Sequence, residues 1–265
     1  MPESDNGPTL QEVEQLARNA GSILRDRYGK EHQLGMKGEV DFATEADHLA
    51  EEFILKHLRK HYPTHHIVAE ETGSNHIVSE HAWYIDPLDG TINFAHGIPM
   101  YCVSIAYAYR GKVKVGVVYD PSRDECFSAE DGKGARLNGE MISVSETQGL
   151  RDSLLVTGFP SEINSTYFIN LDHFSYFSVR TRGVRHIGSA AIDLCYVASG
   201  RVDAFWELIL HPWDYAAGGL IACEAGAIVT TTAGEVLAYG NSSPVLAATP
   251  ALHPEILKVL LSKPE

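Results

Sequence analysis

Apolar residues recur every three or four positions in the N-terminal part of the chain, which is the spacing of amphipathic helices. A first helix is predicted to begin at Thr9, because Glu12 follows at the spacing of a capping box. Its apolar stripe consists of Val13, Leu16, Ala17, Ala20 and Leu24. A second helix is predicted to begin at Thr44, with Asp47 at the same spacing and a stripe of Leu49, Phe53, Ile54 and Leu58. Residues 32–42 contain glycine and are weakly periodic, so we expect a loop or hairpin there.

After residue 65 the pattern changes to short runs of β-branched and aromatic residues separated by turn residues, which is typical of strands. The predicted strands are 66–69, 82–85, 102–109, 112–119 and 125–129, with hairpin turns at Arg110-Gly111 and Asn138-Gly139. From about residue 150 strands alternate with helices. Strands are expected at 154–157, 202–207, 227–230 and 245–249, and helices at 163–177 and from Ser189, Asp214 and His253. This order predicts an N-terminal half, 1–150, and a C-terminal half, 151–265.

The composition is that of a globular protein, with 44% hydrophobic and 21% charged residues in a chain of 265. The net charge of −14 argues against a general nucleic-acid binder, which needs a basic face to neutralise phosphates. We expect no membrane-spanning segment, since no long apolar run occurs, and no signal peptide in the first ten residues. The four widely spaced cysteines are typical of reduced thiols, which predicts a cytoplasmic protein.

The strongest chemical signal is a pair of acids, Asp86 and Asp89, that directly follow an apolar strand. A sharp turn there can aim both carboxylates and the Leu88 carbonyl at one point, and all three are oxygen ligands suited to Mg²⁺. Residues 91–94 would then begin a short helix whose free N–H groups meet a phosphate. The alternative is an ordinary Asp-Pro turn in which Asp89 caps that helix.

Three further acids lie at the ends of predicted elements. Glu70 follows an apolar strand, Asp214 precedes a helix rich in small residues, and Asp47 stands in the first turn of the second helix. Taken singly, each is explained as a solvated strand end or a helix cap. Gathered together, the acids would repel one another unless cations lay between them. A site with two or three Mg²⁺ ions removes that repulsion and leaves positions for phosphate oxygens.

In this order, residues 41–47, 69–71, 83–94 and 213–218 resemble the motifs of the inositol monophosphatase family, within the Mg²⁺-dependent, lithium-sensitive phosphatase superfamily. The similarity covers about residues 10–262, and residues 157–160 and 188–191 match bacterial members in particular. The resemblance implies an α+β fold, an αβαβα sandwich of helical layers and mostly antiparallel sheets, and a homodimer. It also implies hydrolysis of myo-inositol 1-phosphate, a phosphorylated polyol, by in-line attack of metal-activated water.

The same resemblance implies a metal site for two to three Mg²⁺ ions. The first ion would be held by Glu70, Asp86 and the Leu88 carbonyl, and the second by Asp86, Asp89 and Asp214. A third, weaker ion would be bound through water near Glu70 and Asp47.

Catalytic and substrate contacts are implied as well. Glu70 and Thr91 would position the attacking water, with Thr91 hydrogen-bonded to Asp47. The amides of Gly90 and Thr91 would hold the phosphate. The alcohol would contact Asp89, Gly188, Ser189, Ala190 and Glu207.

Related enzymes with these metal motifs hydrolyse fructose 1,6-bisphosphate, histidinol phosphate or NADP. Residues 90–94 and Glu207 favour inositol phosphate, whereas the basic cluster Arg180, Arg182, Arg185 and His186 is either a solvated connector or a contact for a second phosphate. Residues 161–164 lack a basic residue that some bacterial relatives carry, which leaves the substrate open. A regulatory, protein-binding role is the alternative of a different class.

Overall fold

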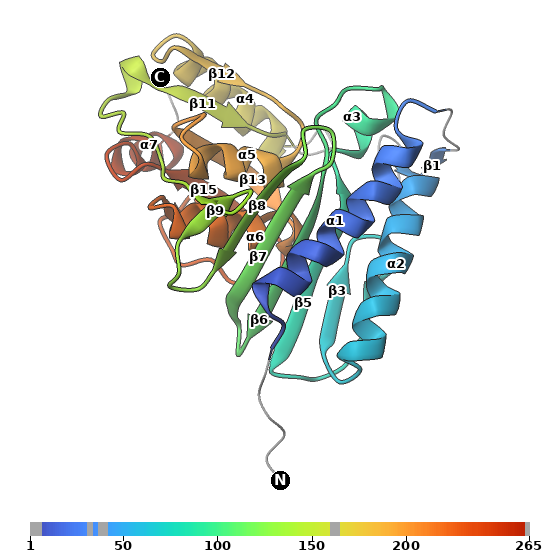
Figure 1. The fold of residues 1–265 in the computed structure, drawn as a ribbon. Helices are drawn as coiled ribbons and strands as arrows, with labels where there is room; N and C mark the ends of the chain where they lie inside the picture. The colour runs from blue at the N-terminus through green and yellow to red at the C-terminus, as the bar shows by residue number, and fades with distance from the viewer. Residues whose placement is uncertain (1–6, 31–33, 37–41, 160–164, 263–265) are drawn as a thin grey trace.

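The computed structural model of this protein describes residues 7–30, 34–36, 42–159 and 165–262. In this part of the chain, layers of helices alternate with two large sheets (Figure 1). The helices are α1 (Leu10–Arg27), α2 (Glu45–His61), α3 (Thr91–Ala95), α4 (Ser165–Ser178), α5 (Ala190–Ala198), α6 (Pro212–Glu224) and α7 (His253–Leu260), with a 3₁₀ turn at Leu150–Asp152.

Fifteen strands are described. They are β1 (Leu34–Met36), β2 (Phe42–Thr44), β3 (His66–Ala69), β4 (Gly73–Ser74), β5 (His81–Asp89), β6 (Cys102–Tyr109), β7 (Lys112–Asp120), β8 (Glu125–Glu130), β9 (Ala135–Leu137), β10 (Glu140–Met141), β11 (Leu154–Thr157), β12 (Gly183–Arg185), β13 (Ala204–Leu210), β14 (Ile228–Thr230) and β15 (Ser243–Ala248). β1 and β2 pair as a hairpin, one of the two forms expected for this segment.

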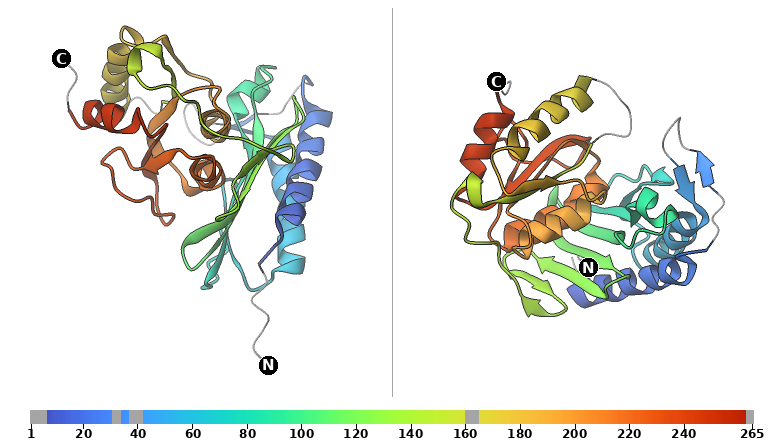
Figure 2. Two further views of the ribbon diagram at one scale, coloured as in Figure 1. Left: turned by 60° about the vertical axis from the view of Figure 1, so that its left-hand side comes forward. Right: turned by 90° about the horizontal axis from the view of Figure 1, so that it is seen from above.

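The larger sheet has the strand order β10-β9-β8-β7-β6-β5-β3-β4, and all of its pairs are antiparallel except β3 with β5. The smaller sheet has the order β12-β11-β13-β15-β14 and is mixed. Helices α1 and α2 cover one face of the larger sheet, α5 and α6 lie between the sheets, and α4 and α7 cover the far face of the smaller one (Figure 2). The expected αβαβα sandwich is confirmed.

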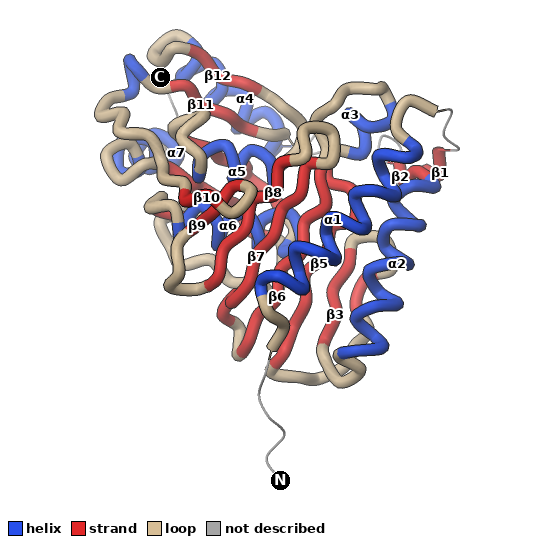
Figure 3. The backbone as a smooth tube through the Cα atoms, in the orientation of Figure 1, coloured by secondary structure: helices blue, strands red, loops and turns tan. Residues whose placement is uncertain are grey.

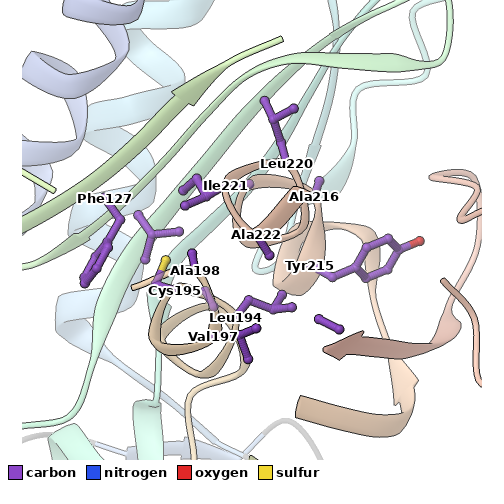
Figure 4. Close-up of a cluster of buried hydrophobic side chains, with 14 of the residues drawn as sticks. Phe127, Leu194, Cys195, Val197, Ala198, Tyr215, Ala216, Leu220, Ile221 and Ala222 are labelled. Carbon is purple, nitrogen blue, oxygen red and sulfur yellow. The ribbon is translucent and has the colours of Figure 1, made fainter. Parts of the chain in front are cut away.

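The central layer joins the two halves of the chain in one core. Leu194, Tyr215 and Ile221 of α5 and α6 belong to the same buried cluster as Phe127 of the larger sheet (Figure 4). Every strand of the larger sheet precedes residue 150, and every strand of the smaller sheet follows it. Because the central helices pack on both sheets, the division into two domains at residue 150 stays a prediction.

The predicted caps and turns are confirmed. Thr9 and Thr44 both cap their helices through capping boxes. Arg110 and Gly111 each have positive φ, at 51° and 73°, as a tight hairpin turn requires. Cys102 and Cys126 are free, buried thiols on β6 and β8. No helix in the described ranges is both long and apolar enough to cross a bilayer.

The predicted buried face of the second helix is wrong in part. Phe53 is 36% exposed and Leu49 is only partly buried. The buried positions of α2 are Ala46, Asp47, Ala50, Glu51, Ile54, Leu55 and Leu58. Two of these are acids, so a search for apolar periodicity alone rotates the stripe away from its true position. Two smaller corrections concern the C-terminal half. Helix α6 begins at Pro212 rather than Asp214, and Gly183–Arg185, within the segment that carries the basic cluster, form β12.

Figure 3 shows the strands of the larger sheet running side by side next to α1 and α2. Side chains alternate between the two faces of each strand, which decides the polar side chains that reach the central layer. On β5, Trp83 and Ile85 belong to the core under α1 and α2, whereas Tyr84 belongs to the core under α5 and α6. Asp86 therefore shares the face of Tyr84. On β13, Trp206 packs in the core of α4 and α7 and Phe205 in the central core, which gives Glu207 the central face.

Candidate active site

The end of β5 is shaped by a bulge and a left-handed glycine. The register with β6 runs through Asp86 opposite Ser104 and then shifts before Asp89 pairs with Cys102. The Leu88 amide donates to Asp86 Oδ1 at 2.9 Å, which closes the turn between the two acids. Gly90 follows with φ 94°, and a Cβ there would lie 2.7 Å from the Met100 carbonyl oxygen. Only glycine fits this position.

Thr91 begins α3 and points back toward α2. Its hydroxyl lies 3.1 Å from Asp47 Oδ1 and 2.9 Å from the Leu88 carbonyl oxygen. Asp47 Oδ2 accepts from the amide and the hydroxyl of Thr44, at 2.8 and 2.5 Å. Asp47 therefore caps α2 with one oxygen and holds Thr91 with the other. Its role in catalysis stays a prediction.

Asp89 connects the two halves of the chain. Its Oδ2 accepts from the Ser189 hydroxyl and from the Ala191 amide, both at 2.7 Å. Ser189 also caps α5, so the carboxylate lies at the beginning of that helix. The residues expected to contact the alcohol, Gly188 to Ala190, are thereby brought beside the end of β5.

Asp214 lies in the first turn of α6, where its Oδ2 accepts from the His211 amide at 2.7 Å. Ser104 donates to the Trp213 carbonyl at 3.1 Å, which anchors this turn to β6 across the strand from Asp86. Burial, followed by the charges of Asp89 and Glu70, raises the pKa of Asp214 well above its usual value.

Glu70 follows β3, which runs parallel to β5, so the carboxyl ends of these strands meet at one edge. Burial, followed by the charges of Glu70, Asp89 and Asp214, raises the pKa of Asp86 well above its usual range. The neighbouring Glu71 points the other way, with Oε2 4.0 Å from His48 Nδ1 on α2.

The side chain of Glu207 occupies space that is free because its neighbour Gly158 has no side chain. It is only 9% exposed, and burial together with the charge of Asp89 raises its pKa to about 8. A Cβ on Gly158 would lie 2.1 Å from Glu207 Oε2, so the glycine of the 157–160 motif makes room for this acid. Asn170 supports the same place, donating to the Gly158 carbonyl at 2.6 Å and accepting from the Trp206 indole at 2.6 Å.

The donor set fits a hard divalent cation. The buried Asp86, the partly buried Asp89 and Asp214, Glu70 and the Leu88 carbonyl supply oxygen only, which is the chemistry that Mg²⁺ prefers. These carboxylates repel one another, which destabilises the fold when no cation is bound. A bound cation would relieve that repulsion. Among the described residues, however, no three His, Cys, Asp or Glu side chains form a ready-made metal site. The ligand assignments therefore stay predictions.

The basic cluster is engaged elsewhere. Arg182 donates to Asp152 at 3.0 Å, and the Arg180 guanidinium lies 3.8 Å from the centre of the Tyr176 ring. Arg185 bonds the carbonyl of its neighbour Val184. These contacts favour a structural connector over a second phosphate site. Two motif residues, Asp41 and Pro160, and residues 161–164 lie outside the described residues.

Two residues near the site are absent from the sequence-based assignments. Asn93 donates to the carbonyls of Met100 and Ile187, at 3.0 and 2.8 Å, and so holds the segment before Gly188. Glu51 accepts from the Glu71 amide at 3.0 Å. The sequence feature that could have identified Glu51 is its spacing, four residues after Asp47, which places both acids on the same buried face of α2 as Ile54.

The sequence profile described as "Inositol monophosphatase family" matches residues 5–265. The chain belongs to this family. It is 43% identical over 248 residues to the inositol-1-monophosphatase of Synechocystis sp., covering 93% of this chain and 86% of the relative. It is also 40% identical over 261 residues to the Nus factor SuhB of Salmonella typhimurium, covering 96% and 95%.

A solved structure supports the same assignment. The inositol monophosphatase from Anabaena (Nostoc) sp. superposes with a TM-score of 0.86 at 39% identity, covering 96% of each chain. The chain is thus a phosphatase of the inositol monophosphatase family, a family that is metal-dependent and acts on small phosphorylated substrates.

Proposed function

We propose that this protein is a Mg²⁺-dependent phosphomonoesterase that hydrolyses myo-inositol 1-phosphate to inositol and phosphate. The observation that carries the proposal is the junction at Asp89. Its carboxylate lies within electrostatic reach of Asp86 and Asp214 and is bonded to Ser189, so the proposed metal ligands and the proposed alcohol contacts adjoin.

Glu70, Asp86, Asp89, Asp214 and the Leu88 carbonyl would hold two to three Mg²⁺ ions. Bound there, the ions would neutralise the phosphate oxygens and lower the pKa of the attacking water. Asp47 accepts from the Thr91 hydroxyl and so orients its oxygen. Together with Glu70, Thr91 would position that water for in-line attack. The Gly90 and Thr91 amides, at the beginning of α3, would hold the phosphate.

On the alcohol side, Asp89, Gly188, Ser189, Ala190 and Glu207 would contact the hydroxyl groups of the ring. A buried carboxyl such as Glu207 binds donors, because an unpartnered acid costs free energy in the interior. Polyols offer several donors at fixed spacing. The engagement of Arg180 and Arg182 with other groups favours a monophosphate over a bisphosphate.

The test is phosphate release in Mg²⁺ from myo-inositol 1-phosphate and from fructose 1,6-bisphosphate, each with and without Li⁺. Fast, Li⁺-sensitive release from the inositol ester is the expected result. Preference for the bisphosphate would reassign the substrate, and equal rates on histidinol phosphate or NADP would do the same. Release without Mg²⁺ would contradict the metal assignment.

A second role is favoured by the name of several relatives, Nus factor SuhB, at about 40% identity. We propose that the chain also binds a protein partner. If so, Asp89→Asn would retain partner binding while losing phosphatase activity. We further propose that the protein is a cytoplasmic homodimer, which light scattering of the purified chain tests directly.

A further inference from the structure

Glu51 is a buried acid with no assigned role. It lies on α2 four residues after Asp47, so the two side chains share one face of the helix. Glu51 is only 1% exposed, and burying a carboxylate costs free energy unless a hydrogen-bond or ionic partner compensates. An acid in this position therefore needs an explanation in its contacts.

One oxygen of Glu51 holds the turn that carries Glu70. Oε2 accepts from the Glu71 amide at 3.0 Å. The turn joins β3 to β4, and on its other side the Glu70 amide donates to the Ile85 carbonyl of β5 at 3.1 Å. The turn is thus held between a strand of the sheet and a side chain of the covering helix.

The other oxygen, Oε1, is buried and has no hydrogen-bond partner within the described ranges. A group retained for stability alone would use both oxygens, since replacing a poorly satisfied buried charge by a neutral group is often neutral or stabilising. The contact that Glu51 does make leads to the proposed active site.

Asp47 and Glu51 together make α2 a common support for two loops of that site. Asp47 holds Thr91 after β5, and Glu51 holds the Glu70–Glu71 turn after β3. Because the acids are one helical turn apart on one rigid element, the helix sets the spacing between Thr91 and Glu70.

We propose that Glu51 is a positioning residue, whose carboxylate fixes the β3–β4 turn and thereby sets Glu70 against the metal and the attacking water. This inference rests on the proposed function and adds a residue to it. The proposed role requires an acceptor atom at the end of a side chain of this length. It does not require the negative charge.

Three substitutions separate the effect of side-chain length from that of charge. Glu51→Gln keeps the length and an acceptor oxygen but removes the charge, and Glu51→Asp keeps the charge but shortens the side chain. Glu51→Met keeps a similar length but removes both the acceptor oxygen and the charge. Glu52 follows on the exposed face of α2, so the same changes at Glu52 are matched controls. Each purified chain is assayed for Mg²⁺-dependent phosphate release, for Mg²⁺ binding by calorimetry without substrate, and for folding by circular dichroism.

We expect Glu51→Gln to keep the Mg²⁺ concentration for half-maximal activity within threefold of the unchanged chain. Glu51→Asp and Glu51→Met should raise it at least tenfold and weaken calorimetric Mg²⁺ binding by the same factor, with unchanged circular dichroism. If Glu51→Met does not fold, Glu51→Asp against Glu51→Gln still decides. Retained Mg²⁺ affinity in Glu51→Asp with loss in Glu51→Gln would overturn the proposal, as would equal behaviour of all three. A chain that shows no Mg²⁺-dependent release before any substitution would instead overturn the proposed function, and the inference with it.

Discussion

The Ser189 hydroxyl lies 2.7 Å from Asp89 Oδ2, although the two residues are 100 positions apart in the chain. This contact joins the end of β5 in the larger sheet to the beginning of α5 in the central layer. It places the strongest acidic motif of the N-terminal half beside the small-residue segment of the C-terminal half. The proposed metal and alcohol sites are adjacent because of it.

Replacing Asp89 by Asn tests this junction. The amide keeps hydrogen-bonding capacity toward Ser189 and Ala191 but loses the charge, so we expect at least a ~100-fold loss of kcat. The free energy of unfolding in EDTA should not decrease, because the removed carboxylate is partly buried and desolvation raises its pKa. Asp26→Asn, on an exposed position of α1, is the control. Normal turnover in Asp89→Asn would refute the metal assignment.

Thr91 is expected to act through its hydroxyl alone. Thr91→Ala removes the contact to Asp47 Oδ1 and should lower kcat by about 100-fold, whereas Thr91→Ser keeps the hydroxyl and should retain most activity. Steady-state kinetics at saturating Mg²⁺ distinguish the two. Equal losses in Ser and Ala variants would indicate that the methyl group, and hence packing, is what matters.

Gly158 is expected to be required only because Glu207 lies against it. Gly158→Ala places a Cβ 2.1 Å from Glu207 Oε2 and should lower the free energy of unfolding by about 1–3 kcal/mol through overpacking. The loss should shrink when Glu207→Ala is present as well, which chemical denaturation measures as a double-mutant cycle. Gly149→Ala is the control, since nothing lies within 4 Å of a Cβ there. Additive effects would contradict the clash.

Mg²⁺ is expected to stabilise the fold as well as to support activity. A ligand that binds only the native state at 100 times its Kd adds about 2.7 kcal/mol to the free energy of unfolding. Thermal melts in EDTA and in excess Mg²⁺ should therefore differ by several degrees, and the difference should be much smaller in Asp89→Asn. Identical melts of the unchanged chain in both buffers would argue against a metal site in this acidic cluster.

His65 is expected to make stability depend on pH. Trp83 Nε1 donates to its Nδ1 at 3.0 Å, its ring stacks on His81 at 4.3 Å, and burial together with His81 lowers its pKa to about 4. The unfolded chain binds this proton below about pH 6.5 but the folded chain does not until about pH 4.

Stability should therefore fall as the pH decreases through this window, with a contribution of up to about 1.4 kcal/mol per pH unit from His65. Urea denaturation at several pH values, in EDTA, gives the free energy of unfolding of the unchanged chain and of His65→Asn. The quantity compared is the slope of this free energy against pH, not its absolute value. The slope should be shallower in His65→Asn. Parallel curves would mean that other groups account for the dependence.

Local signals predicted most elements and the key turn of the site. Capping at Thr9 and Thr44 needs partners only three residues away, and a hairpin turn needs only the positive φ of Arg110 and Gly111. For the same reason the run from Asp86 to Thr91 could be recognised from sequence. Its bulge, glycine and short helix are formed by residues that are close neighbours in the chain.

The tertiary structure decided what these local elements contact. Leu49 and Phe53 have the apolar character of a buried stripe, yet α2 buries Asp47 and Glu51 instead, because each acid finds a hydrogen-bond donor on a distant loop. Asn93 and Asn170 owe their roles to carbonyls and an indole brought close by sheet packing. Periodicity reports which residues avoid water on average, and it contains no information on partners far along the chain. The sequence by itself therefore determined the elements and the acids, and only packing determined which acids face one another.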